Sequence, residues 1–115
     1  MNILITGSGN YLGKYLIKKF LEKNINIFAI SNKKISIKNK RFHHIKHQLS
    51  KKPFLKIKKK IDAIIHISGP SFRKENKIDD YISGNILSAL NTEYMRNFYR
   101  PRVLFYTSTR EVYGD

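Results

Sequence analysis

The most constraining feature of the sequence is a glycine-rich turn at residues 6–13 (TGSGNYLG), which joins two segments of different periodicity. Before the turn, residues 3–6 form a short apolar run typical of a strand. After it, apolar residues recur at helical spacing from Leu12 to Leu21, with lysines on the opposite side. A strand that enters a helix through glycines predicts a tight turn whose backbone N–H groups can bind an anion.

Four further apolar runs of strand length follow this turn. The run at residues 61–67 is almost continuous in apolar character, which is typical of a strand covered on both faces in a parallel sheet. Together with residues 3–6, these runs predict five strands, the later four at residues 25–30, 42–45, 61–67 and 103–107.

Helical signals separate these strands. A long helix is predicted at residues 78–98, with Asp79 and Asp80 in its first turn and Pro101 beyond its end. A short helix is predicted over residues 50–57, with Pro53 in its first turn. Strands alternating with helices in short units predict an α/β domain, a Rossmann-like doubly wound parallel sheet of about five strands in the order 3-2-1-4-5.

Length and composition exclude several classes of protein. A chain of 115 residues allows one domain at most, and no run of about eighteen apolar residues or charged leader is present, so we expect a soluble, cytoplasmic protein with no membrane partner. The absence of Cys excludes disulfide frameworks and thiolate metal sites. The cluster of His43, His44 and His47 lacks a nearby carboxylate, so no metal site is expected. His66, inside an apolar strand, is predicted to be a hydrogen-bonded core residue.

The net charge of +15 comes almost entirely from one block, residues 23–61, which holds thirteen Lys or Arg and no Asp or Glu. Such a block is consistent with an RNA-binding or other polyanion-binding module. It has only Phe28, Phe42 and Phe54 as aromatic residues and matches no nucleic-acid motif. An excess of Lys, Ile and Asn also follows from genome composition alone, and we favour that explanation over a nucleic-acid partner.

Each glycine of the turn has a predicted role. Gly7 permits the tight turn, Gly9 lets the backbone approach a pyrophosphate, and Gly13 lets helix and strand pack closely. At this point the sequence resembles the extended short-chain dehydrogenase/reductase family of NAD-dependent epimerases and dehydratases, whose usual pattern is Thr-Gly-x-x-Gly-x-x-Gly. Here Gly9 stands one residue early, and Asn10 fills the position where the family has its middle glycine. Asn is tolerable there because it enters left-handed conformations more readily than most residues. Asn10 is also a candidate cap of the helix.

The resemblance implies a nicotinamide dinucleotide cofactor, NAD or NADP. The end of the second strand would face the adenosine ribose, where an Asp or Glu usually binds NAD. This chain has Ser31, Asn32, Lys33 and Lys34 there, which favours the 2′-phosphate of NADP. The implied cofactor-binding residues are Gly7, Ser8, Gly9, Asn10, Tyr11, Leu12, Gly13, Ser31, Asn32, Lys33, Gln48, Leu49, Ser68, Gly69, Asn85 and Thr107.

The segment at residues 106–115 (YTSTREVYGD) is the most specific part of the resemblance. In relatives, the last hydroxyl of this cluster orients the substrate hydroxyl that is oxidised, a role that falls here on Thr109. Related dehydratases follow it with an Asp-Glu pair, but here Arg110 replaces the acid and only Glu111 remains as a catalytic candidate. Elimination is therefore disfavoured, and epimerase, reductase and decarboxylase chemistry stay open.

The family's catalytic base is a Tyr-x-x-x-Lys pair that lies beyond this segment. The one such pair here, Tyr15 and Lys19, follows the glycine turn and is read as a coincidence. The resemblance therefore implies that residues 1–115 are a partial NAD(P)-binding Rossmann domain, truncated before the substrate lobe and catalytically silent alone. A complete relative would bind a nucleotide sugar and could form a homodimer. The alternatives are the polyanion-binding module and a non-functional product of a truncated gene.

Overall fold

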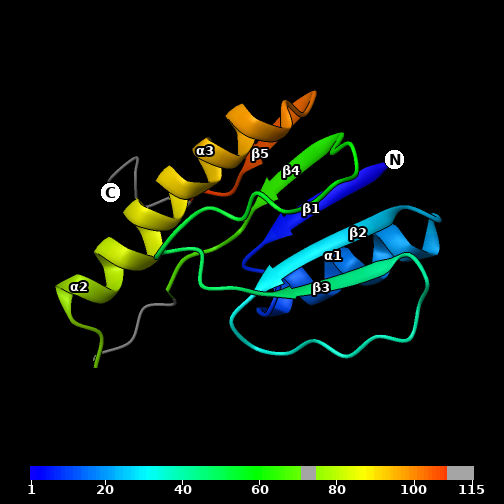
Figure 1. Ribbon diagram of the computed structural model, residues 1–115. Coiled ribbons are helices and arrows are strands. Elements are labelled where there is room, and N and C mark those ends of the chain that lie inside the picture. The colour runs from blue at the N-terminus through cyan, green and yellow to red at the C-terminus, as the bar shows by residue number, and fades with distance from the viewer. Residues whose placement is uncertain (71–74, 109–115) are drawn as a thin grey trace.

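The computed structural model describes residues 1–70 and 75–108, which form one parallel sheet with helices on both faces (Figure 1). The strands pair in the order β3-β2-β1-β4-β5, which confirms the predicted order 3-2-1-4-5. All pairings are parallel, and β1 lies between β2 and β4 at the centre of the sheet. The bounds are β1 (Asn2–Thr6), β2 (Asn26–Ser31), β3 (Phe42–Lys46), β4 (Ala63–His66) and β5 (Val103–Tyr106).

Alternation along β1 divides the core between the two faces of the sheet. Ile3 and Ile5 point to α1 (Tyr11–Glu22) and pack with its Ile17. Leu4 points the other way and packs with Met95 of α3 (Ser88–Tyr99). The central strand is thus covered on both faces, which explains its continuous apolar character.

The long helix predicted at residues 78–98 is present, but it contains a π-helical segment that the sequence did not predict. It runs through α2 (Ile78–Tyr81), η1 (Ile82–Leu87) and α3 without a break. At the junction of η1 and α3, the Ser88 hydroxyl donates to the Gly84 carbonyl. Single π turns inside α-helices often accompany functional sites.

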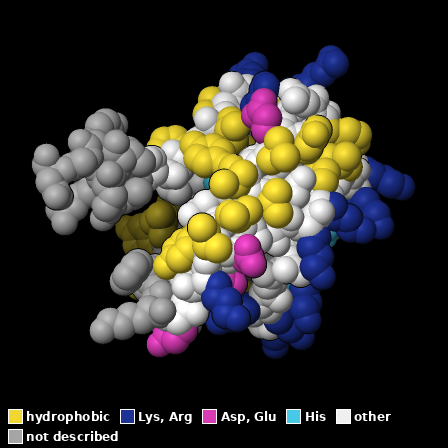
Figure 2. Space-filling model, turned by 90° about the vertical axis from the view of Figure 1, so that its left-hand side faces the viewer, with side chains coloured by type: hydrophobic (Ala, Val, Ile, Leu, Met, Phe, Trp, Pro, Cys, Tyr) yellow, Lys and Arg dark blue, Asp and Glu magenta, His cyan; other side chains and the backbone are white. Residues whose placement is uncertain are grey.

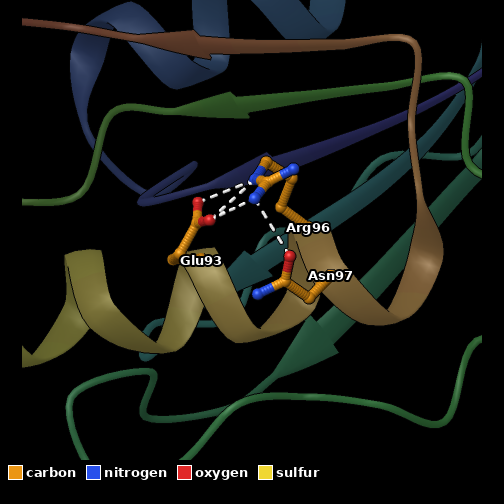
Figure 3. A network of polar contacts seen from close by, with 3 residues as sticks. All are labelled: Glu93, Arg96 and Asn97. Atoms are coloured by element: carbon orange, nitrogen blue, oxygen red, sulfur yellow. Dashed lines mark hydrogen bonds and ion pairs between the residues drawn. The ribbon is translucent and has the colours of Figure 1, made fainter.

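An exposed polar network lies on α3 (Figure 3). The Nε of Arg96 is 2.8 Å from each carboxylate oxygen of Glu93, and its Nη2 donates to Asn97 Oδ1 over 3.0 Å. The hydrogen bond from Arg96 lowers the pKa of the Glu93 carboxyl. Because both side chains are exposed, this ion pair adds little to the stability of the helix.

The predicted helix over residues 50–57 is wrong. A turn at residues 49–51 is followed by irregular chain up to residue 60. Pro53 disfavours a helical conformation in the residue before it, and Tyr99 of α3 binds the backbone of the segment. The Tyr99 hydroxyl donates to the Phe54 carbonyl over 2.7 Å and accepts from the Ile57 N–H over 3.2 Å. These backbone groups are therefore satisfied by a side chain and not by a helix.

The basic block at residues 23–61 surrounds the β3 edge of the sheet. The connections before and after β3 both carry exposed lysines, and Lys46 at the end of β3 is itself exposed. Lysine on an edge strand hinders pairing with the edges of other chains.

Within residues 1–70 and 75–108, none of the helices has the length and apolar character needed to cross a bilayer.

Candidate functional site

A cavity of about 680 Å³ opens at the carboxyl ends of the central strands, within the size range of small-ligand sites. It lies beside the turn after β1, where the strand order reverses and α/β proteins bind ligands. Its lining includes ten of the predicted cofactor-binding residues, namely Gly7, Gly9, Asn10, Ser31, Asn32, Lys33, Gln48, Leu49, Ser68 and Gly69. The structure therefore brings these separate segments together around one space.

Two glycines of the turn are required by packing. Gly7 has a φ of 70°, and a Cβ there would lie 2.5 Å from the Ser68 Cα. A Cβ on Gly13 would lie 2.6 Å from the Ser8 Cα. Gly9 differs, because its Cβ would meet the Ser31 Cβ at an ordinary 3.5 Å. No described residue therefore requires a glycine at position 9 for packing, and the Gly9 backbone faces the cavity with no side chain over it.

Asn10 caps α1 as predicted, but the left-handed conformation proposed for it is wrong. Its φ of −82° and ψ of 174° are extended. Its Oδ1 accepts from the Gly13 N–H over 2.7 Å, and its Nδ2 donates to the Ile67 carbonyl over 3.1 Å. Helix geometry leaves the N–H groups of Tyr11 and Leu12 without intrahelical partners. The Tyr11 side chain is 87% exposed and does not fill the cavity, so the positive helix end faces it openly.

The end of β2 forms a polar corner of the cavity. The buried Ser31 hydroxyl donates to the Lys33 carbonyl over 2.5 Å and lies 2.8 Å from Nε2 of His44. A hydroxyl has one proton, so Ser31 accepts from His44 in this arrangement. Asn32 and Lys33 are exposed and line the cavity, whereas Lys34 is not among its lining residues. This corner therefore offers amide and ammonium donors.

The opposite wall comes from the long helix and was missed by the sequence analysis. Asp80, Ser83, Gly84 and Ser88 recur on one side of α2, η1 and the start of α3, and that spacing of small and polar residues was the available signal. A Cβ on Gly84 would lie 2.4 Å from the Pro70 Cδ, so the helix closely approaches the loop after β4. The lining residues that were not predicted are Ile30, His47, Ser50, Pro70, Asn76, Asp80, Ser83, Gly84 and Ser88.

Several predicted cofactor-binding residues support the cavity from outside its lining. The Ser8 side chain is fully buried and donates to the Ile30 carbonyl over 2.9 Å. The Thr107 hydroxyl donates to the His66 carbonyl over 3.1 Å. The Asn85 Oδ1 lies against Gly69, 2.9 Å from where a Cβ would be. Tyr11, Leu12 and Gly13 are likewise not lining residues, and the catalytic candidates Thr109 and Glu111 lie outside the described residues.

His66 is a hydrogen-bonded core residue, as predicted. It is 2% exposed, and its Nδ1 lies 2.7 Å from Thr6 Oγ1 and 2.8 Å from Thr92 Oγ1. Its ring centroid is 4.4 Å from that of Tyr106. Burial lowers the pKa of His66 to about 4, so the imidazole is neutral near pH 7. This one side chain therefore joins the end of β1, next to the glycine turn, to α3.

The other histidines and the Tyr15–Lys19 pair are less buried than His66, and of these histidines His44 bonds to Ser31 at the polar corner. His43 stacks on Phe28 at a centroid distance of 4.8 Å, and His47 bonds to the Lys52 carbonyl over 2.8 Å. Within the described residues, no three His, Cys, Asp or Glu side chains gather as metal ligands. Lys19 lies 5.8 Å from the Tyr15 ring centroid, on the exposed side of α1.

Comparison with known proteins identifies the family. The sequence model of the NAD dependent epimerase/dehydratase family matches residues 3–115. The chain belongs to the NAD dependent epimerase/dehydratase family. Among curated proteins, this family member is similar to UDP-glucuronic acid decarboxylases 6 and 3 of Arabidopsis thaliana, with 33% and 30% identity over 127 residues. Each alignment covers the whole chain and 35% of the relative, so the chain spans about a third of these relatives' length.

Solved structures confirm the family fold. UDP-galactose 4-epimerase superposes with a TM-score of 0.82 at 18% identity, over the whole chain and 40% of that protein. UDP-glucuronic acid 4-epimerase from Bacillus cereus, in complex with NAD, also gives a TM-score of 0.82, at 22% identity, over the whole chain and 42% of that protein. At these identities the likeness establishes the fold alone.

Proposed function

We propose that this chain binds a nicotinamide adenine dinucleotide in the cavity and forms the cofactor-binding portion of a nucleotide-sugar epimerase, dehydratase or reductase-type enzyme. The observation that carries the proposal is the cavity at the open start of α1, with Gly9 bare beside it. The family description names NAD, and one solved relative holds it. When bound, the dinucleotide would supply the ring that exchanges hydride with substrate.

The pyrophosphate fits the start of α1. The N–H groups of Tyr11 and Leu12 and the helix dipole favour an anion there. Gly9 has no side chain to keep a phosphate from the backbone, and Asn10 is turned away into its cap and its bond to Ile67. A dinucleotide laid across this turn would reach the corner at Ser31 with its adenosine half.

The choice between NAD and NADP depends on that corner. The matched family is described as NAD dependent, and the Bacillus cereus 4-epimerase structure is a complex with NAD, so neither comparison supports a preference for NADP. The preference rests on the exposed Lys33 ammonium group at the cavity and on the lack of a carboxylate at the end of β2. Parallel titrations with NADH and NADPH would measure it.

The direct test is a calorimetric titration of the purified chain with NADH. We expect saturable binding of one NADH per chain. Gly9→Ala should weaken binding at least tenfold, about 1.4 kcal/mol, because a methyl group would stand where the phosphate approaches. Its thermal stability should stay close to that of the parent, since the added Cβ makes an ordinary contact. Tyr15→Ala, on α1 outside the cavity, is the control that should bind normally, and equal binding by both variants would contradict the proposal.

The substrate of the complete enzyme is proposed from the relatives. The proteins named above act on UDP-sugars by their names, as decarboxylases and 4-epimerases. We therefore propose a nucleotide sugar as the substrate class, with Thr109 orienting the reacting hydroxyl and Glu111 as a second catalytic candidate. Turnover assays of a complete protein with UDP-glucuronic acid and UDP-glucose, with and without Thr109→Val, would test this assignment.

A further inference from the structure

A second cavity, which we call the amino-end cavity, lies towards the amino ends of the strands. Its volume is about 310 Å³, at the lower end of the range of small-ligand sites. It lies on the face of the sheet that α3 covers, because its residue Phe28 packs in the same core cluster as Met95. Its lining residues are Asn2 of β1, Asn26 and Phe28 of β2, His43 of β3 and Lys59 of the segment before β4.

The walls of the amino-end cavity can stack on a planar ring and bond to its edge. The exposed His43 ring stacks on Phe28, with centroids 4.8 Å apart and ring planes at 21°. The Asn26 Nδ2 donates to Asn2 Oδ1 over 2.9 Å, and the Asn2 Nδ2 donates to the Lys60 carbonyl over 2.7 Å. Each amide nitrogen carries two protons, so each has a second one to donate to a ligand. Rings that stack and groups that bond to base edges are what proteins use to hold unstacked bases.

The two chain segments that enter β3 and β4 are basic, and both reach the sheet at its amino end. Their Lys and Arg residues, which we call the amino-end cations, are Lys40, Arg41, Lys56, Lys58, Lys59 and Lys60, and the five lysines are exposed. Arg41 Nη1 lies 3.4 Å from Asn26 Oδ1, so the guanidinium adjoins the cavity wall. In the part of the chain that the structure describes, Lys60 alone among the six has an ion-pair partner, Asp62, at 3.9 Å. These cations therefore leave a positive field beside the cavity.

Genome composition explains an excess of lysine, but it does not explain this placement. Residues 62–115 of the same chain hold seven basic and seven acidic residues. On α1 and α3, Lys19 pairs with Glu22 and Arg96 pairs with Glu93. Figure 2 views the side towards which the strands point in Figure 1, and that side carries Asp or Glu side chains as well as Lys or Arg. The weakly compensated charge at the amino end is therefore a local feature that fits an anionic partner.

We propose that the amino-end cavity and the amino-end cations bind single-stranded nucleic acid. One base would lie in the cavity against His43, with the amides of Asn2 and Asn26 at its edge, and the lysines would contact the neighbouring phosphates. A single strand fits this arrangement and a duplex does not, because the bases of a duplex remain stacked. The site is separate from the cavity beside the glycine turn, since no residue lines both.

Fluorescence anisotropy with labelled oligoadenylate and oligodeoxyadenylate tests the proposal on the whole chain and distinguishes RNA from DNA. We expect saturable binding of at least one of them, with an affinity that falls steeply with salt because phosphate contacts release counterions. His43→Ala should weaken binding at least about fivefold, because it removes a stacking ring. Lys59→Gln should weaken binding several-fold and reduce the salt dependence.

The matched controls remove the same kinds of group away from the amino-end cavity. Tyr15→Ala removes an exposed ring from α1, and Lys34→Gln removes an exposed ammonium group from the segment after β2. Both should bind the oligonucleotide like the parent. Thermal unfolding of His43→Ala and Lys59→Gln checks that each remains folded, and the two variants remove different contacts.

Three results would overturn the proposal. One is the absence of saturable binding of either oligonucleotide at low salt by a chain that is folded by circular dichroism. Another is equal affinity of His43→Ala, Lys59→Gln and their controls. The third is binding of duplex RNA or inorganic polyphosphate as tightly as of the single strand, since charge alone would then account for the affinity. Binding is measured without NADH, so the result is independent of the cofactor proposal, and added NADH should not displace the oligonucleotide.

Discussion

The two walls of the cavity are built in different ways. The wall at the glycine turn is made of backbone, and its shape is fixed because Gly7 and Gly13 have no space for a side chain. The wall on the long helix is made of side chains and one close contact, that of Gly84 with Pro70. The first wall is a glycine turn at a helix N-terminus, which is a general way to bind phosphate. The second wall depends on how the long helix packs against the rest of the domain. A sequence therefore reveals the first wall more readily than the second.

The largest expected effect is at the backbone wall. Gly7→Ala should destabilise the fold by about 3 kcal/mol or more, because it combines a left-handed φ with overlap of the Ser68 backbone. Urea unfolding followed by circular dichroism would measure the loss. Gly9→Ala is the internal control and should change stability by less than about 1 kcal/mol. Equal stability of Gly7→Ala and Gly9→Ala would contradict the claim that packing requires glycine at position 7 but not at position 9.

The second prediction concerns His66, which connects the two walls. Its pKa is about 4 in the folded chain and near 6.5 when unfolded, so below pH 6.5 the unfolded chain binds a proton that the folded chain lacks. Stability should therefore be full above pH 6.5 and fall by up to about 3 kcal/mol towards pH 4. Thermal unfolding across this range measures the change.

A variant identifies the source of that pH dependence. His66→Gln should be less stable than the parent at pH 7 but should lose the part of the slope between pH 6.5 and 4 that His66 contributes. Tyr15→Ala, which removes no imidazole, is the control variant and should keep the slope. An unchanged slope in His66→Gln would contradict the lowered pKa of this imidazole.

A smaller effect is expected at the helix wall. Gly84→Ala forces a Cβ to 2.4 Å from the Pro70 ring, which costs about 1–3 kcal/mol, but alanine regains about 1 kcal/mol of helix propensity. We expect a net loss of about 1 kcal/mol and NADH binding weakened several-fold, because the loop after β4 must shift. Calorimetry and thermal unfolding would measure both. If Gly84→Ala were more stable than the parent and bound NADH equally well, the close contact of Gly84 with Pro70 would not be needed to form this wall of the cavity.

The smallest effect is expected at the corner of the backbone wall. Lys33→Gln should reduce NADPH affinity by about threefold and leave NADH affinity unchanged, because an exposed ammonium group contributes a modest, screened attraction to a 2′-phosphate. Lys34→Gln, outside the cavity lining, is the control. Titrations with NADH and NADPH at low and high salt would measure these affinities. An equal loss of affinity for both cofactors would mean that Lys33 does not interact with the 2′-phosphate.

The sequence predicted the elements whose signals are local. The periodicity of β1 and α1, the turn between them and the cap at Asn10 depend on near neighbours, and all were found. The segment at residues 50–57 could not be predicted, because Tyr99, more than forty positions away, binds its backbone. The helix wall was missed although Asp80, Ser83, Gly84 and Ser88 recur along the predicted helix, because the π turn that brings them to one side has no simple sequence signal.

The π turn has a consequence for how such sites diverge. It takes up one residue more than an α-helix would, and each helical residue advances by roughly 100° around the axis. Loss of a single codon within Ile82–Leu87 would therefore return this segment to an ordinary α-helix with little rotation of the turn at Ile78–Tyr81, and Asp80 would stay at the cavity. The anchoring of α3 on the sheet would not change. A related gene could thus change the cavity residues within the π turn by one small deletion, with its core and Asp80 in place.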